Sequence, residues 1–315
     1  MTLGEVLASV LQLTIVVVGG PLVVGLIRTV RARCEGRVGP PVRQPLRDLR
    51  KLFAKERIAP VHSSWVFGIA PVVLVATGAV AAVIVPFVST RSPFDRVGDL
   101  FVVAGLLLVG TVFLALAGLD PGTAFGGMGA SRDMTIAAVA EPTLVLALVA
   151  LAIQAGSSNL GVIVGTTLDH PQSVASVAFL LSLFALVIAT LAENARLPVD
   201  NPSTHLELTM VHEAMVLEYA GPDLALVELG SSMRLVIFLG LVAQLFVPWG
   251  IATDTSVGSL VLASAVFALK LGVLGAALAA FEIFTAKIRL FRVPELLALS
   301  FVLAFLAVVS AVVLG

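Results

Sequence analysis

Charged residues are scarce in this chain. Only 12% of its 315 residues are Asp, Glu, Lys or Arg, whereas 59% are hydrophobic, and the mean hydropathy is +1.09. A soluble globular domain needs much more polar surface than this composition supplies. The scarcity of charge therefore excludes a soluble enzyme or nucleic-acid-binding domain, and it predicts an all-α polytopic membrane protein.

Cysteine is nearly absent as well, because Cys34 is the only one. A single thiol excludes an internal disulfide framework, and an iron–sulfur cluster needs several cysteine ligands. If redox chemistry is involved, its metal is therefore expected elsewhere. A basic leader and a small-residue cleavage site are also missing at the N-terminus, so the first apolar run is expected to be a membrane helix and not a signal peptide.

Long apolar runs, by contrast, are plentiful. A helix needs about 20 predominantly apolar residues to cross a bilayer, and eight stretches meet this requirement. An even number of spans places both termini on the same side. The predicted spans run from Leu3 to Ile27, Ser64 to Val88, Asp99 to Leu119, Thr135 to Gly156, Ser173 to Ala192, Met233 to Ala252, Val257 to Ala280 and Glu295 to Leu314.

Lysine and arginine are distributed unevenly between the linkers. Sixteen of the nineteen fall in the linkers after spans one, three, five and seven, and ten of these are in the first linker. The positive-inside rule therefore places these linkers in the cytoplasm and both termini outside, in a multi-pass protein of the inner (cytoplasmic) membrane. We expect residues 1–315 to form one transmembrane domain, with cytoplasmic loops at about 28–63, 120–134, 193–232 and 281–294.

The first cytoplasmic loop, RTVRARCEGRVGPPVRQPLRDLRKLFAKER, has a net charge of +7. Pro45 suits the first turn of a helix, and Leu46, Leu49, Leu52 and Phe53 would share one face of it. The segment therefore predicts an amphipathic helix lying in the membrane interface. Contact with anionic lipid would explain the charge by itself, but the GRVGPP turn before the helix favours a shaped platform for a partner protein.

The linker after the third predicted span (the third loop) contains the glycine-rich segment FGGMGA. It lacks the GxxxxGK(S/T) pattern of a phosphate-binding loop. A tight surface turn is therefore expected here, and a nucleotide site is not.

The linker after the fifth predicted span (the fifth loop) is unusually acidic. Five carboxylates and two of the four histidines fall within ENARLPVDNPSTHLELTMVHEAMVLEY, residues 193–219. Asn201 can cap a helix that starts at Pro202 and ends before Gly221-Pro222. Glu207 and Glu218 are eleven residues apart and would share one face of that helix. We therefore expect it to pack into the protein with its carboxylates in a hydrated interior.

The same loop contains a partial metal-binding pattern. His212-Glu213 begins the HExxH motif of zinc proteases, but Val216 stands where the second histidine would be. A metal site is therefore not expected, and hydrogen-bonded structural histidines are the favoured interpretation.

Away from the span ends, the predicted spans contain the charged residues Glu141, in the fourth, and Lys270, in the seventh. An isolated charge at that depth costs several kcal/mol, so each must be paired, neutralised or hydrated. A single buried ion pair would satisfy this requirement. The alternative is a ribbon of titratable groups that continues through Glu228 and Glu282 toward the cytoplasmic face and could pass protons in steps.

Three loops together resemble those of a known family. GRVGPPVRQPLRDLRKLFAKE, FGGMGASRDM and AENARLPVDNPSTHLELTMVHEAMVLEYAGPDLALVE are similar to loops of the membrane subunit shared by respiratory complex I (the H-type subunit of NADH-quinone oxidoreductase, or subunit 1) and the group 4 membrane-bound NiFe hydrogenases. PVDNPSTHLELTMVHEAMVLEY and AKIRLFRVPELL favour the hydrogenase branch, of the formate hydrogenlyase subunit 4 and hydrogenase-4 component C type. Both segments differ from their counterparts in complex I, which argues against a bound quinone.

The resemblance implies a subunit that anchors a cytoplasmic redox arm to antiporter-like membrane subunits and conducts protons or Na+. It implies no redox centre in this chain, with a NiFe centre and iron–sulfur clusters in hydrogenase-like (or complex I-like) large and small subunits. By residue match, the ion path falls on Glu141, Glu193, Asp200, Glu207, Glu213, Glu218, Glu228 and Glu282, and the depth of Lys270 adds that residue. Docking of the arm is expected from the basic residues Arg37, Arg43, Arg47, Arg50, Lys51, Arg132, Arg196 and Arg289.

Three hypotheses remain open on the sequence. The first is the coupling and docking subunit of a hydrogenase-type oxidoreductase. The second is the quinone-site subunit of a complex I-like enzyme. The third is a stand-alone cation/proton antiporter built around Glu141 and Lys270, which inverted repeats or broken helices would support; neither is visible in the sequence.

Overall fold

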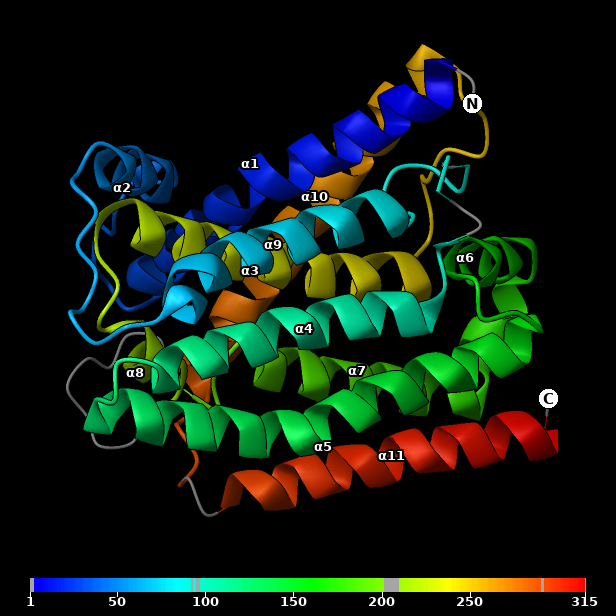
Figure 1. Cartoon of the computed structure of the whole chain (residues 1–315). Helices are drawn as coiled ribbons and strands as arrows, with labels where there is room; N and C mark the ends of the chain where they lie inside the picture. Colours follow the sequence, from blue (N-terminus) through cyan, green and yellow to red (C-terminus); the bar gives the residue numbers. More distant parts are fainter. Residues whose placement is uncertain (1–2, 92, 95–96, 201–209, 290–291, 315) are drawn as a thin grey trace.

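The computed structural model describes residues 3–91, 93–94, 97–200, 210–289 and 292–314, and within these ranges it contains helices and no strands. The all-α prediction is therefore confirmed for the described part of the chain (Figure 1). The elements are α1 (Leu3–Cys34), α2 (Gln44–Phe53), α3 (Trp65–Ile84), α4 (Leu100–Leu119), α5 (Ala124–Ala155), α6 (Leu160–Asp169), η2 (Pro171–Ala175), α7 (Val177–Glu193), α8 (His212–Val216), α9 (Gly221–Phe246), α10 (Val257–Phe284) and α11 (Val293–Leu314).

Among the described residues, seven helices are long and apolar enough to cross a membrane: α1, α3, α4, α5, α9, α10 and α11. Helix α7 corresponds to the predicted fifth span, but it has only 17 residues. At about 1.5 Å per residue, such a helix extends roughly 26 Å, somewhat less than a hydrocarbon core of about 30 Å. A multi-pass membrane protein is thus supported, whereas the count of eight spans stays a prediction.

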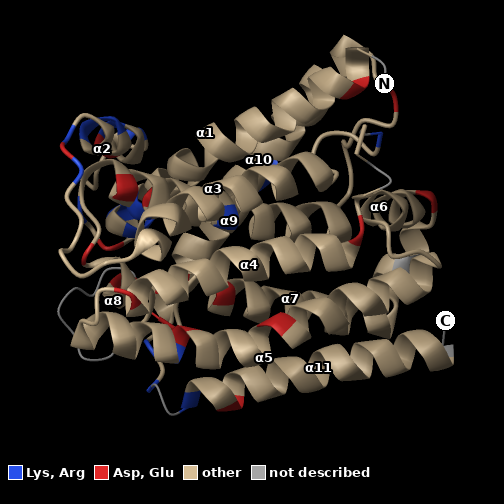
Figure 2. Ribbon diagram, in the orientation of Figure 1, with Lys and Arg blue, Asp and Glu red and all other residues tan. Residues whose placement is uncertain are grey.

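Charge is concentrated at one end of the molecule. Most of the Lys, Arg, Asp and Glu residues in Figure 2 lie at the end where α2 and α8 are found. Both chain termini lie at the opposite end in Figure 1. The positive-inside rule predicts such an unequal distribution of charge between the two ends of a multi-pass membrane protein.

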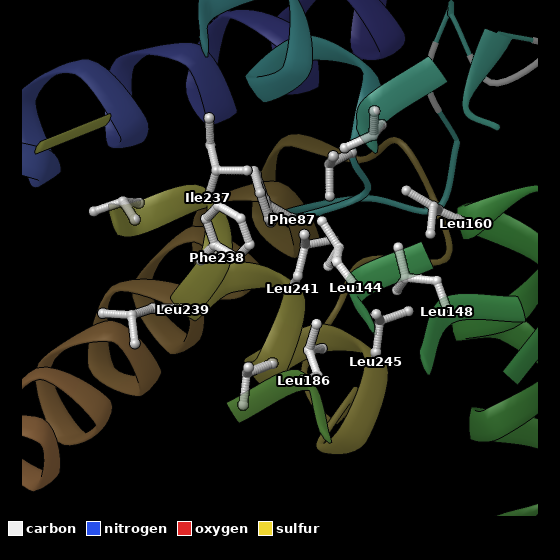
Figure 3. Packing of buried hydrophobic residues seen from close by; sticks show 14 of the residues in the cluster. Phe87, Leu144, Leu148, Leu160, Leu186, Ile237, Phe238, Leu239, Leu241 and Leu245 are labelled. Atoms are coloured by element: carbon white, nitrogen blue, oxygen red, sulfur yellow. The ribbon is translucent and has the colours of Figure 1, made fainter. Parts of the chain in front are cut away.

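Helix α9 forms the centre of the bundle. In its most apolar 18-residue window 72% of the residues are buried, against 28% for α10 and α11. Figure 3 shows its side chains Phe238, Leu241 and Leu245 packing toward Leu144 of α5 and Leu186 of α7. Residues on α9 therefore face protein on nearly every side, and a charged residue there must be satisfied by the protein.

Helix starts follow the local sequence. Ser64, Asp99, Thr123, Ser176 and Ser256 precede α3, α4, α5, α7 and α10, and each accepts a hydrogen bond from a backbone N–H in the first turn. Such caps satisfy N–H groups that have no partner within the helix. The positions at which these five helices begin are therefore set by short-range chemistry.

The predicted amphipathic helix exists as α2. It has proline in its first turn, Leu49 is buried, and Arg47 and Arg50 are exposed. The helix packs against α1 and α9 and is seen end-on in Figure 1, so it lies across the direction of the long helices. The apolar face of α2 is therefore packed against other helices of the protein.

The surface turn expected in the third loop is limited to residues 119–122, where the Gly122 N–H donates to the Leu119 carbonyl oxygen at 3.0 Å, and it does not include the glycine-rich segment. Helix α5 begins at Ala124, so the segment FGGMGA forms its first turns. A Cβ atom on Gly129 would lie 2.8 Å from the Ala214 side chain and from the Val211 carbonyl oxygen, which belong to the α8 region. The glycines therefore allow close packing of helices and do not reverse the chain direction.

The fifth loop also differs from its prediction. Residues 201–209, which include the predicted cap Asn201, Pro202 and Glu207, lie outside the described residues. Downstream, α8 covers only His212–Val216, and Gly221-Pro222 begins α9 instead of ending a helix. Pro222 suits the first turn of a helix because it lacks an N–H. Arg234, counted among the linker cations beside the predicted start of the sixth span at Met233, lies well inside α9.

The close packing at Gly129 yields a prediction with a control on the same helix. Gly129→Ala should lower the free energy of unfolding by about 1–3 kcal/mol, because the added methyl group forces α8 away from α5. Gly127→Ala, at a position where a Cβ meets nothing within 4 Å, should be neutral or stabilising by up to about 1 kcal/mol. Denaturant unfolding of the purified protein in detergent measures both, and equal effects of the two changes would contradict the packing argument.

Candidate functional site

A cavity of about 190 Å³ lies at the charged end of the bundle. Helices α1, α2, α3, α4, α5, α7, α8 and α9 contribute to its wall, together with residues 194–196 and Asp200. Its volume is sufficient for several water molecules. The ionisable side chains that line it are Arg28, Asp133, Glu193, Arg196, Asp200, His212, Glu213, Glu228 and Arg234.

Arg234 forms the most deeply buried charge cluster on this cavity. Its Nη2 donates a hydrogen bond to Oε2 of Glu193 and lies 4.0 Å from Oε1 of Glu141. Its Nη1 donates to Thr111 Oγ1 and to the Leu107 carbonyl oxygen. The exposed fraction is 10% for the Arg234 side chain, 9% for Glu141 and 2% for Glu193. One buried cation thus stands between two buried carboxylates.

Several polar atoms around this cluster have no hydrogen-bond partner among the residues that the structure describes. They are Oε1 of Glu141, Oε1 of Glu193, Oδ1 of Asn194 and Nε of Arg234. Buried polar atoms without partners are rare, and at a cavity they indicate positions for water or for an exchangeable proton. The cluster can therefore bind protons and waters as well as cross-link helices.

Asp200, on the cavity wall, holds the residues just before α8 in place. Its Oδ1 accepts a hydrogen bond from Lys287 Nζ at 2.8 Å, and its Oδ2 accepts from the backbone N–H groups of Val211 and His212 at 3.2 and 3.4 Å. Arg132 donates to the Met210 carbonyl oxygen at 3.1 Å in the same segment. These bonds fix the chain just before α8 against α5 and against the residues after α10.

Glu282 occupies a different environment, since two arginines neutralise it. Its Oε1 accepts a hydrogen bond from Arg196 at 3.3 Å, and its Oε2 lies 3.9 Å from Arg31. Burial lowers the pKa of the Arg196 guanidinium, and the neighbouring Glu282 carboxylate opposes that shift. The usual pKa of arginine is so high that the group stays charged, and the ion pair therefore ties the 194–200 segment to α10 and α1.

The structure brings together some of the predicted ion-path residues and separates others. Glu193, Asp200, Glu213 and Glu228 line the cavity, and Glu141 lies beside Arg234 at its inner end. Glu218, by contrast, is exposed, because α8 ends at Val216 and the long helix that was to turn Glu218 inward does not form in the described residues. Glu207 lies outside the described residues.

Lys270 is far from the acidic cavity. Its Nζ donates to Gln244 Oε1 at 2.8 Å and to the Val247 carbonyl oxygen. Gln244 and Arg234 are ten residues apart on α9, which corresponds to about 15 Å along a helix. Glu141 lies beside Arg234, so Glu141 and Lys270, around which the antiporter hypothesis was built, have different partners and do not form one site.

The predicted docking residues fall into two groups. Arg132 and Arg196 bond to atoms of the same chain at the cavity wall, as described above, which does not suit binding of a partner. The remaining basic residues are exposed, and of these Arg37 is paired with Glu35; the set is Arg37, Arg43, Arg47, Arg50, Lys51 and Arg289.

Sequence reasoning missed four residues that the site uses. Asp133 lines the cavity near His212 and Arg234, while Lys287 and Arg31 neutralise predicted carboxylates. Arg234 had a detectable signal, because it is the only charged residue between Glu228 and Asp254. Within the described ranges, no group of three or more His, Cys, Asp or Glu side chains is arranged to hold a metal ion.

Comparisons with known proteins bear on this site. The family model described as NADH dehydrogenase matches residues 7–314. The chain is 34% identical over 306 residues to formate hydrogenlyase subunit 4 of Escherichia coli, covering 97% of this chain and 98% of that protein. It is 36% identical over 265 residues to hydrogenase-4 component C of the same organism, covering 84% and 82%.

More distant relatives share the fold. The H-type subunit of the NADH-quinone oxidoreductase of Syntrophotalea carbinolica is 29% identical over 267 residues, covering 76% of this chain and 78% of that protein. A chain in the structure of the membrane-bound sulfane sulfur reductase, an archaeal respiratory membrane complex, superposes with a TM-score of 0.83 at 21% identity, covering 98% and 100%. The resemblance inferred from the loops is therefore confirmed.

Arg31 lies close to two carboxylates, Glu282 and Glu35. Replacing each of them in turn gives a matched pair of variants. Glu282→Gln leaves Arg196 buried beside a neutral group and should lower the free energy of unfolding by about 3 kcal/mol, as expected when one partner of a buried pair is removed. Glu35→Gln removes the other, exposed carboxylate that bonds to Arg31 and should leave stability close to that of the wild type. Denaturant unfolding in detergent measures both, and a wild-type stability of Glu282→Gln would contradict the assigned structural role.

Proposed function

The chain belongs to the NADH dehydrogenase family, and from this premise we propose that it is the membrane anchor and coupling subunit of a multisubunit membrane-bound oxidoreductase of the hydrogenase type. In this role it docks a cytoplasmic redox arm and conducts protons or Na+ through carboxylates at and beside a cavity. The observation that carries the proposal is the cavity at the charged end, where Glu193, Asp200, Glu213 and Glu228 surround a space large enough for water.

The coupling role follows from the arrangement of these groups. Carboxylates around a hydrated cavity can exchange protons with its water, and charged groups within a membrane protein typically mark an ion path. Glu141 does not line the cavity, but it lies 4.0 Å from Arg234 and adds a further carboxylate to this set. A change of position or charge in the arm above the cavity would alter which of these carboxylates holds a proton.

The docking role rests on the surface formed by α2 and its flanking loops. This surface combines exposed cations with exposed apolar side chains, including Val38, Val61 and Trp65. Large exposed apolar groups beside polar ones are typical of binding surfaces. Basic residues that served only to orient the chain or bind lipid would not need this apolar component.

The hydrogenase assignment draws on the relatives. Formate hydrogenlyase subunit 4 matches nearly the whole chain, so we assign large and small hydrogenase-like subunits with a NiFe centre and iron–sulfur clusters to the arm, and antiporter-like subunits to the membrane part. The proposed topology has eight spans with α7 as the short one. The charged end faces the cytoplasm, and both termini lie on the outer side of the inner membrane.

A second candidate is the quinone-site subunit of a complex I-like enzyme. The cavity has an apolar side, formed by Pro21 and Val24 of α1, Pro45 and Leu49 of α2, and Leu224 of α9. Small-molecule sites are mostly apolar with a few polar groups, and a subunit of NADH-quinone oxidoreductase is among the relatives. The hydrogenase assignment is preferred because formate hydrogenlyase subunit 4 is matched at higher identity and over more of the chain.

Purification of the intact complex through a tag on this chain tests the proposal and decides between the two candidates. We expect a nickel-containing large subunit to co-purify, whereas a flavin-containing subunit would favour the complex I-like alternative. Replacing Arg47, Arg50 and Lys51 with Gln should release the arm while this chain stays in the membrane. The charge-preserving control, with Arg47 and Arg50 changed to Lys, should retain the arm, and equal retention in both variants would contradict electrostatic docking.

A further inference from the structure

Arg234 is surrounded by oxygen atoms from three other helices. Leu107 and Thr111 of α4 provide a carbonyl and a hydroxyl oxygen, and Glu193 of α7 provides a carboxylate oxygen, all bonded to the guanidinium. Glu141 of α5 adds a further carboxylate oxygen at 4.0 Å. The Phe238 ring, 5.7 Å from the guanidinium carbon, lies on the same helix and helps to hold the group in place.

This set of oxygens is of the kind that binds small hard cations. Carboxylate, carbonyl and hydroxyl oxygens are the usual ligands of such ions, and sites of this composition bind Na+ in transporters. Here, the guanidinium takes the position of the ion. It is permanently charged, and its fixed N–H groups already occupy the oxygen atoms that Na+ would need.

We propose that Arg234 is a tethered cation that excludes Na+ from the Glu141–Glu193 pair and so makes this step of the path selective for protons. The inference rests on the proposed ion-conducting function and specifies which ion it carries. One guanidinium balances one carboxylate, and a second ionised carboxylate at this depth would lack compensation. A proton neutralises the second carboxylate by binding to one of its oxygens. Na+ would need several oxygen ligands at once, and Arg234 already occupies these ligands through its hydrogen bonds.

The unpartnered atoms fit this assignment. Among the described residues, Oε1 of Glu193 has no hydrogen-bond partner while its Oε2 is bonded to Arg234, and Oε1 of Glu141 faces Arg234 at 4.0 Å without a hydrogen bond. A proton can bind to either of these single oxygens, whereas Na+ would need several oxygens at once. The alternative is that Arg234 serves only to cross-link α9 to α4 and α7. A purely structural arginine would affect stability equally in any salt, and this difference makes the two roles separable.

The test measures the unfolding temperature of the purified intact complex in Na+ and in choline at equal ionic strength. Arg234→Gln should empty the site and give a Na+-dependent rise in unfolding temperature that grows with the logarithm of the Na+ concentration above half-saturation. The wild type and Arg234→Lys should show no such rise, and Arg234→Gln combined with Glu193→Gln should lose it. Equal behaviour of Arg234→Gln in both salts would overturn the proposal.

A second comparison tests the exclusion of Na+ even if the complex with Arg234→Gln does not assemble. In the wild type, a Na+-dependent rise that Glu141→Gln removes would show that Na+ already reaches the pair and would overturn the proposal, while its absence supports exclusion. Neither measurement requires turnover. A complex that fails to translocate ions would therefore count against the proposed function and would leave the result on Na+ exclusion standing by itself.

Discussion

A charge buried within a membrane protein must be neutralised by the same protein, and the Arg234–Glu193 pair satisfies that requirement at the centre of this bundle. Arg234 stands on α9, the most buried of the spanning helices, and reaches α4, α5 and α7 through its bonds and contacts. Breaking such a pair leaves an uncompensated charge, which costs several kcal/mol. The positions of four helices therefore depend on one guanidinium and its partners.

The same requirement explains why the carboxylates of this chain have different roles. Glu282 is held by two arginines and Asp200 by a lysine and two backbone N–H groups, so both serve mainly to fix the wall of the cavity. Glu193 and Glu141 share one cation and each keeps an unpartnered oxygen. In the proposed function, the first pair maintains the shape of the cavity and the second exchanges protons with it.

Much of the fold could be predicted from the sequence because its signals are local. Apolar runs identified the spanning helices, and Pro45 with its apolar neighbours identified α2. The errors arose where one local pattern fits two structures. Gly221-Pro222 can end a helix or begin one, and the glycines of residues 124–130 suit a turn as well as close helix packing, which only the position of α8 decides.

The candidate site was predictable only in part, for a related reason. The acidic residues were visible in the sequence, but their partners are distant along the chain: Glu193 pairs with Arg234, and Asp200 with Lys287. No pattern in a single sequence specifies such pairs, so it could not distinguish the carboxylates that fix the wall from those that remain free to titrate. Glu218 was assigned to the interior on helical spacing, and it is exposed because that helix does not extend to it.

The most direct test of the account compares Glu193→Gln with Glu218→Gln in proteoliposomes that contain the intact complex. Gln is nearly the same size as Glu but cannot release and rebind a proton near neutral pH. Glu193→Gln should retain redox turnover with an artificial acceptor while losing most of the proton gradient, and Glu218→Gln should retain both. A normal gradient with Glu193→Gln would contradict proton conduction through the cavity and would leave its carboxylates a purely structural role.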